Sequence, residues 1–319
     1  MATEFGERRL LACSFRQLAE KHLVRPVRRK ILVAGKLPAT AGWQPALPRE
    51  RSGVLQKRPI IRGTTLLHRI WTVALVLASF IIAQIASADW EVASTYRDSS
   101  SVANVQHRHI VLQNSSENAT IDLAVFPANS ATLRVVDNPS GSENLADVMR
   151  RENFIAGVNG GYFDTRFKPL GLRMIDGTMR SPLVRARLLT GVLCASSRGI
   201  EIVRLGEFSQ KKKCDAAIEC GPFLIDGGVP VRGLDQSRRA RRTFVAVTRT
   251  GNATIGVSRE LSLAELAGVL SALPDFKVWR ALNLDGGSSS AFWFRRNGVT
   301  PFSIAEEKAV RDFVGIVAH

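Results

Sequence analysis

Short apolar runs rich in β-branched residues recur along the C-terminal part of the chain and constrain its fold more than any other feature. The runs are four to six residues long, and those at 109–113, 121–126 and 132–137 are bounded by Asn, Ser and Pro, which is typical of strands separated by turns. The polar stretch 89–108 lacks this pattern and is expected to be an irregular lead-in. The sequence predicts strands at 109–113, 121–126, 132–137, 155–159, 170–175, 191–195, 200–204, 222–225, 243–248, 280–285 and 313–317.

Two segments have a helical pattern instead. In 262–273, Ser262 and Glu265 have the spacing of a capping box ahead of an apolar stripe of leucines and Val269. In 142–154, apolar residues fall on one face after a candidate Ser cap. This element order predicts an α+β fold, with a mixed β-sheet core and flanking helices in a single domain.

The net charge of +16 suggests nucleic acid at first, but its distribution argues against that class of partner. Residues 1–69 hold 15 Lys and Arg against 4 Asp and Glu, while 89–319 hold 29 against 24. The basic excess is therefore concentrated in the N-terminal arm. No nucleic-acid partner is expected for the remainder.

Residues 70–88 are uncharged, are apolar over most of their length and end in an A-x-A pattern after a basic flank. These features indicate a secretory signal peptide, with an uncleaved membrane anchor as the alternative. Either way, residues 89–319 are expected outside the cytoplasm, in the periplasm or secreted, or held at the inner membrane. The arm 1–69 is unusually long for a leader, so it is either a cytoplasmic tail or precedes a later translation start.

The cysteines predict one disulfide. Cys13 lies in the arm, and Cys194, Cys214 and Cys220 lie in the exported part. Three cysteines in an oxidising compartment predict one disulfide and one free thiol, with the pairing left open. Their spacing matches no zinc motif, and no His in a nearby motif supports a catalytic Cys.

Four segments share one design, in which an apolar strand is joined to Gly or other small or polar residues. Glycines allow the backbone to approach a ligand closely, and successive N–H groups in such turns can bind an anion. Serine hydroxyls add donors and acceptors. The segments are GVNGGYFD (157–164), IECGPFLIDGG (218–228), RRTFVAV (241–247) and ALNLDGGSSSAFW (281–293).

These four motifs, in this order, resemble the phosphodiester glycosidase family. The resemblance runs from about residue 155 to 318 and includes VRDFVGIV at 310–317 as the closing strand. The family includes a lysosomal enzyme that removes N-acetylglucosamine from a phosphodiester, and bacterial envelope proteins associated with exopolysaccharides. The resemblance implies an exported hydrolase that cleaves a glycosyl-phosphate diester and releases sugar.

The resemblance and the chemistry together nominate site residues. Glycosidases usually employ two carboxylates; Asp285 is the first choice, with Asp164 or Glu219 as the second. Arg242, with Arg173 behind it, is the candidate for pairing with phosphate. The candidate substrate-binding residues are Asn159, Gly160, Gly161, Arg173, Gly221, Arg242, Thr243, Asn283, Gly286, Gly287, Ser288 and Ser289, and Pro222 also matches the second motif.

Alternatives remain open. Arg242 lies in a basic run and also fits a solvated surface, and Glu219 beside Cys220 also fits a structural role. The chain could be a non-catalytic glycan-binding accessory of exopolysaccharide assembly that tolerates loss of Asp285. It could also be a metal-dependent phosphodiesterase in which Asp164, Asp226 and Asp285 hold a divalent cation such as calcium, although their spacing matches no metal motif. No other cofactor is expected.

Overall fold

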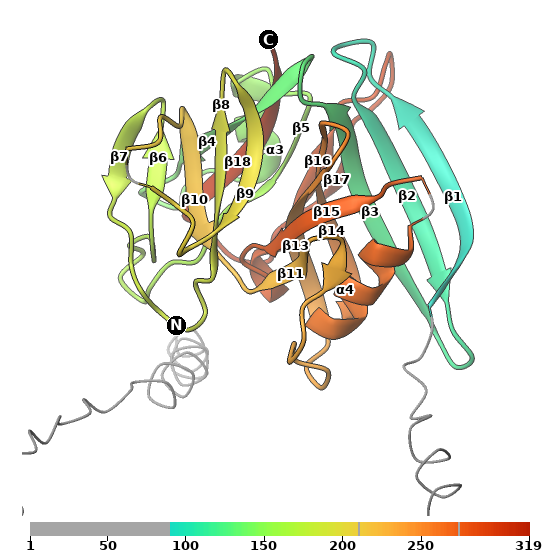
Figure 1. Ribbon diagram of the computed structural model, residues 1–319. Helices are drawn as coiled ribbons and strands as arrows, with labels where there is room; N and C mark the ends of the chain where they lie inside the picture. The colour runs from blue at the N-terminus through green and yellow to red at the C-terminus, as the bar shows by residue number, and fades with distance from the viewer. Residues whose placement is uncertain (1–89, 210, 274) are drawn as a thin grey trace, which may run out of the picture. The chain divides into compact units, whose positions relative to one another are not determined.

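The computed structural model describes residues 90–209, 211–273 and 275–319, which fold into three antiparallel β-sheets (Figure 1). The largest sheet has eight strands in the order β1-β2-β3-β14-β13-β15-β11-β12. These are Glu91–Ser99 (β1), Gln106–Gln113 (β2), Asn118–Pro127 (β3), Phe223–Asp226 (β11), Val229–Pro230 (β12), Ala240–Thr248 (β13), Asn252–Leu261 (β14) and Val278–Asn283 (β15).

Two five-stranded sheets make up the rest of the β-structure, with orders β7-β6-β10-β8-β9 and β17-β16-β5-β18-β4. The first contains Arg173–Ile175 (β6), Thr178–Ser181 (β7), Gly191–Ser196 (β8), Gly199–Arg204 (β9) and Ala216–Cys220 (β10). The second contains Ala131–Asp137 (β4), Ala156–Asn159 (β5), Phe292–Phe294 (β16), Phe302–Ile304 (β17) and Asp312–Ala318 (β18). Figure 1 places β6 to β10 on the left and β1 to β3 on the right.

The central strand β13 is buried on both faces. Successive side chains of a strand point to opposite faces, so neighbouring residues of β13 belong to two different cores. Val245 and Val247 belong to the core between the sheets, together with Leu193 and Val314. Phe244 and Ala246 belong to a second core on the opposite face, which also holds residues of helix α4. This double burial explains why β13 reads as a continuous apolar run after Thr243.

Two α-helices occur in the described part of the chain, Leu145–Arg151 (α3) and Leu263–Ala272 (α4). The predicted capping box of α4 is confirmed: Ser262 accepts from the Glu265 N–H, and Glu265 accepts from the Ser262 N–H. Helix α3 is shorter than the predicted 142–154, and its cap is Asn144 rather than Ser142. Both helices fill gaps beside sheets rather than forming a layer; α3 contacts β5 and β16, and α4 contacts β11 and β15.

The predicted fold class is therefore wrong. The chain is β-rich, and every strand pair among the described residues is antiparallel, whereas an α+β fold with a mixed sheet and flanking helices was expected. The capping box and apolar stripe of α4 were predicted correctly, but the bounds and cap of α3 were wrong, and the polar edge strand β1 and the long strand β14 were missed. In β1 most side chains are exposed, so the strand has no apolar period to detect.

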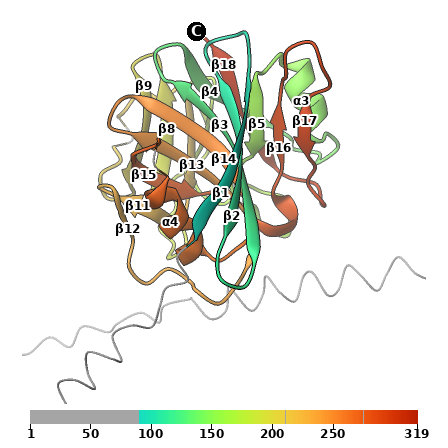
Figure 2. The same cartoon turned by 90° about the vertical axis from the view of Figure 1, so that its right-hand side faces the viewer.

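The N-terminal predictions fall outside the described residues. The arm 1–69 and the segment 70–88, expected to be a signal peptide or anchor, are not covered. Within residues 90–319, apart from the two gaps, no helix has the length and apolarity needed to cross a bilayer. Figure 2 views the described part from the side of β1 and β2, which lie in front of β3 and β14.

The disulfide joins Cys194 in β8 to Cys214, which comes just before β10. Cys220 remains a buried free thiol. One disulfide and one free thiol in the exported part were expected, and the structure supplies the pairing that the sequence left open.

Candidate active site

Asn159, the last residue of β5, joins three of the four sequence motifs. Its side-chain nitrogen donates to the main-chain oxygen of Asp285 at 2.7 Å. Its side-chain oxygen accepts from the Thr243 hydroxyl at 2.7 Å and from the Ala291 N–H at 3.0 Å. Asn159 is fully buried. Residues that lie 84 to 132 positions away along the chain therefore meet at one amide.

The two glycines after Asn159 allow the chain to pass against β18. The Gly160 N–H donates to the main-chain oxygen of Asp312, and the Gly161 N–H donates to its carboxylate, both at 2.7 Å. A Cβ on Gly160 would lie 1.8 Å from the Asp312 carboxylate, and one on Gly161 would lie 2.0 Å from Arg173. Any side chain at either position would displace this buried pair.

Arg173 is engaged in that pair and lies inside the protein. Its Nε donates to Asp312 at 2.8 Å, and its other nitrogens donate to main-chain oxygens of Tyr162, Leu172 and Glu219. The side chains of Arg173 and Asp312 are each 1% exposed. The geometry gives Arg173 a role in supporting the turn at 160–162, rather than a free guanidinium for phosphate.

The Asp285 carboxyl lies on the turn that follows β15, beside Ser289. The main-chain N–H of Asp285 donates to the Gly160 main-chain oxygen, and one oxygen of the Asp285 carboxyl accepts from the Gly286 N–H at 3.0 Å. Burial raises the pKa of this carboxyl above its ordinary value, while the Ser289 hydroxyl and the charge of Lys308 oppose that rise. Asp285 is thus a carboxyl that is partly shielded from water and has a cation nearby.

The turn after Asp285 brings Lys308 to this position. Residues Gly287–Ser289 form a short 3-10 helix that starts with Gly287 at a φ of +66°, a conformation that favours glycine. The main-chain oxygen of Ser288 accepts from the Glu307 N–H at 2.8 Å. The ammonium of Lys308 lies 5.3 Å from the centre of the Phe163 ring. The fourth motif, Phe163 and the exposed Lys308 therefore border one region.

Tyr162 connects the second motif to the fourth. Its hydroxyl donates to the Gly221 main-chain oxygen at 2.7 Å and accepts from the Asn283 amide at 2.9 Å. Burial raises the Tyr162 pKa well above its ordinary value, so the phenol stays protonated. The Asn283 side-chain oxygen is buried and has no hydrogen-bond partner among the described residues.

Arg242 lies at the start of β13, next to the buried Thr243. Its guanidinium donates to the main-chain oxygens of Leu261 and Arg238. Burial lowers its pKa from the ordinary value, and its charge acts on the Tyr162 phenol. Gly286 passes close to it, since a Cβ there would lie 3.8 Å from atoms of Arg242. Arg242 therefore borders the Asp285 turn.

Glu219 is buried in β10 and holds neighbouring loops. One carboxyl oxygen accepts from the N–H groups of Leu172 and Val184 at 2.8 and 2.9 Å, and the other has no partner among the described residues. A Cβ on Gly171 would approach that carboxylate to 2.8 Å. These contacts fit the structural role more closely than the catalytic one.

Asp164 and Asp226 are occupied elsewhere. Asp164 accepts from the N–H groups of Arg166 and Lys168 and so closes its own turn. Asp226 pairs with Arg204 and Arg280, beside the Gly227–Gly228 turn and at the end of β15 away from Asp285. In the residues that the structure covers, no group of three or more His, Cys, Asp or Glu side chains is arranged to hold a metal ion.

Three residues at this site were not nominated from the sequence. Tyr162 lies in NGGYFD and Asp312 in VRDFVGIV. Because both segments are motifs of the family, membership in them could have identified these two residues as site residues. Lys308 lies in no motif, and only the link from Ser288 to Glu307 brings it near Asp285. Together the groups that border the turn offer the Asp285 carboxyl, the cations of Arg242 and Lys308 and several hydroxyl and amide groups, which suits a ligand that is both polyhydroxylated and anionic.

Comparison with known proteins agrees with the motif assignment. The sequence model described as phosphodiester glycosidase matches residues 152–317, more than half of the chain. The uncharacterized protein YigE of Escherichia coli is 28% identical over 125 residues, which cover 36% of this chain and 49% of that protein. The chain thus matches about half the length of this curated relative.

Solved structures with a similar course of the chain include a protein from Synechocystis, with a TM-score of 0.49 and 17% identity over 67% of this chain and 62% of that one. Another is the catalytic domain of zebrafish N-acetylglucosamine-1-phosphodiester alpha-N-acetylglucosaminidase, auto-inhibited by its pro-peptide. It has a TM-score of 0.46 and 16% identity, over 73% of this chain and 85% of that one.

Proposed function

The chain belongs to the phosphodiester glycosidase family, and from this premise we propose that it hydrolyses a glycosyl-phosphate diester at the bond between the anomeric carbon and oxygen. Water adds to the anomeric carbon, the C–O bond breaks, and a phosphomonoester leaves with the bridging oxygen. The products are a free sugar and a phosphomonoester. The observation that carries the proposal is that hydrogen bonds join all four family motifs at the turn that carries Asp285.

Asp285 is proposed to act at the sugar. A carboxylate near the anomeric carbon can stabilise an oxocarbenium-like transition state and take a proton from the attacking water. Its raised pKa makes it a stronger base than an exposed Asp. A phosphomonoester leaves easily, so a strong second acid is less needed than in ordinary glycosidases.

The phosphate is proposed to lie between Arg242 and Lys308. A phosphodiester carries a negative charge, and charge-assisted hydrogen bonds to guanidinium or ammonium groups hold it strongly. The Arg242 guanidinium donates hydrogen bonds to two main-chain oxygens, and these bonds fix the direction of its remaining donors.

The decisive experiment follows the oxygen of water. We would incubate the full chain with an N-acetylglucosamine-1-phosphate diester in H₂¹⁸O and analyse both products by mass spectrometry. Label in the free sugar is expected. Label in the phosphomonoester instead, with activity lost on adding EDTA, would overturn the proposal in favour of a metal-dependent phosphodiesterase.

Variants test the residue roles in the same assay. Asp285→Asn should lower kcat at least a hundredfold, because it removes the proposed base. Arg259→Gln, an exposed arginine on β14 outside the site, is the matched control for Arg242→Gln, which should raise KM. Binding of a glycan without turnover of any diester would instead support a binding accessory.

The cellular setting is also a proposal: an extracytoplasmic enzyme acting on cell-envelope glycans such as exopolysaccharides. The basic flank and apolar residues 70–88 support export, and the Cys194–Cys214 disulfide suits an oxidising compartment. Fusing alkaline phosphatase, which is active only after export, to the C-terminus tests it. An inactive but intact fusion would place the domain in the cytoplasm.

A further inference from the structure

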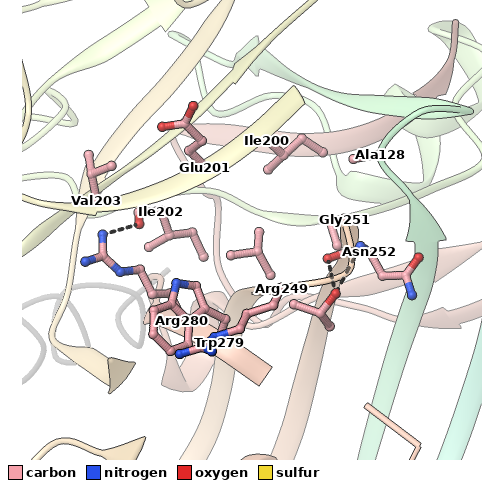
Figure 3. A pocket seen from close by; sticks show the side chains of 13 residues that line it. Ala128, Ile200, Glu201, Ile202, Val203, Arg249, Gly251, Asn252, Trp279 and Arg280 are labelled. Atoms are coloured by element: carbon pink, nitrogen blue, oxygen red, sulfur yellow. Dashed lines mark hydrogen bonds between the residues drawn. The ribbon is translucent and has the colours of Figure 1, made fainter. Parts of the chain in front are cut away.

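A separate pocket lies at the opposite end of β15 from Asp285. It encloses about 550 Å³ and is lined by residues of β9, of β15 and of the turn between β13 and β14 (Figure 3). It shares no residue with the candidate active site. Trp279 and Asn283 are four residues apart on β15, so the two sites are separated by roughly 13 Å along that strand. A glycan chain of a few sugar units spans such a distance.

The floor of this pocket is apolar. Ile202 and Val247 are almost fully buried and Ala253 is completely buried, and all three belong to the core between the sheets. Ile200 of β9 continues the same surface. The pocket is therefore an opening in the edge of the core, of a size that suits one or two sugar rings.

An uncommitted cation borders this floor. The Arg249 guanidinium lies 3.7 Å from the centre of the Trp279 ring, and no hydrogen bond or ion pair engages it among the described residues. The neighbouring Arg280 is different, because Glu207 and Asp226 neutralise it and the Ile202 oxygen accepts from it. Figure 3 places Arg249 beside Trp279 at the pocket wall.

A polar rim accompanies that cation. The side-chain amide of Asn252 takes part in no hydrogen bond within the described residues, although its main chain is held by Thr248. Glu201, the acidic residue of the lining, is paired with Lys212. The net unbalanced charge at the pocket is therefore that of Arg249, and the complementary ligand is an anion.

We propose that this pocket binds an anionic sugar residue, a uronate or a phosphorylated sugar, of the same glycan whose phosphodiester reaches Asp285. The proposal rests on the proposed function. An arginine that pairs with a carboxylate or phosphate, an aromatic ring beside it and an apolar floor for the faces of sugar rings form a site for an acidic saccharide. The pocket would anchor the chain while hydrolysis proceeds at the far end of β15.

Calorimetry on the full chain tests the binding. The probes are tetragalacturonate for the uronate, glucose 6-phosphate for the phosphate, and maltotetraose as the neutral control. Tetragalacturonate or glucose 6-phosphate should bind, and Arg249→Gln should weaken that binding about tenfold to a hundredfold through loss of one charge-assisted pair. Arg249 is exposed, so this variant should fold.

Control variants separate this pocket from the active site. Arg232→Gln, at another exposed arginine, should leave affinity unchanged. Trp279→Phe keeps a smaller ring and should weaken binding less than Arg249→Gln. Equal affinity in wild type and Arg249→Gln, equal binding of maltotetraose, or no heat with either anionic probe at millimolar concentration would overturn the proposal.

The two proposals fail in different ways. If the diester assay gives no free sugar but Arg249→Gln still loses probe binding, the pocket stands as a glycan site and the hydrolytic function fails. If sugar is released but the probes do not bind, the hydrolysis stands and the pocket proposal fails. With an acidic polymeric substrate, Arg249→Gln should raise KM and leave kcat unchanged.

Discussion

The Asn159 amide accepts a hydrogen bond from the Thr243 hydroxyl at 2.7 Å and donates one to the Asp285 main chain at the same distance. One buried side chain thus fixes the start of β13 and the turn that carries the candidate catalytic carboxyl. The position of Asp285 depends on this residue, which need not contact a substrate itself.

Asn159→Ala should therefore destabilise the protein and lower activity together. It leaves the Thr243 hydroxyl and the Ala291 N–H unpaired inside the protein, which costs about 1–3 kcal/mol for each unsatisfied group. Urea denaturation measures the loss. Asn118→Ala, at an exposed position of β3, is the control and should change stability by less than about 0.5 kcal/mol. Equal stability of both variants would contradict the role of Asn159.

The Arg173–Asp312 ion pair predicts a double-mutant result. Removing one partner leaves a buried charge uncompensated, so Arg173→Met should cost about 3–5 kcal/mol. Arg173→Met with Asp312→Asn removes both charges and should recover part of that loss, since the neutral amide oxygen can still accept from the Gly161 N–H. Additive losses in a double-mutant cycle would show that the pair is not coupled.

The raised pKa of Asp285 predicts that the stability of the protein falls as pH rises, whereas activity that needs the ionised carboxylate increases. Because burial favours the neutral carboxyl in the folded state, its contribution to stability is complete below the pKa of an unfolded Asp and is lost as pH rises through the folded-state pKa. Asp285→Asn, which cannot ionise, should be more stable than wild type at neutral pH. Denaturation midpoints measured across pH should converge in acid.

Ser289→Ala should shift the acidic limb of the activity profile. The Ser289 hydroxyl lowers the Asp285 pKa, so its removal should raise that pKa and move the fall in kcat/KM to higher pH. The profile should keep its shape. A lower kcat at every pH with no shift would mean that Ser289 acts on the substrate rather than on Asp285.

Removing the disulfide should lower stability without altering the site. The bond closes a loop with a sequence separation of 20, and loops near this length contribute about 3 kcal/mol. The Cys194→Ala/Cys214→Ala variant should lose this amount in urea denaturation and become insensitive to dithiothreitol. Cys220 should remain unreactive toward thiol reagents in the folded protein, because burial raises its pKa to about 12.

The local residue pattern determined the strongly periodic elements. Capping and an apolar stripe located α4, and β-branched runs located β3, β4 and β18, because these signals depend only on neighbours along the chain. Strand β1 was missed for the same reason, since most of its side chains are exposed and give no pattern of alternating apolar residues. The motif order also sufficed to assign the family.

The direction of strand pairing and the grouping of site residues were decided only by the tertiary structure. Whether two strands pair parallel or antiparallel depends on how segments that are distant in sequence lie beside one another. The predicted helices gave no information on this, so they did not indicate that all the described pairs are antiparallel. Both Arg173 and Arg242 were candidates for phosphate binding from the sequence. Arg173 is buried in an ion pair with Asp312, whereas Arg242 borders the Asp285 turn. Burial and charge pairing are properties of the packed chain, and they decide which of two identical side chains can meet a ligand.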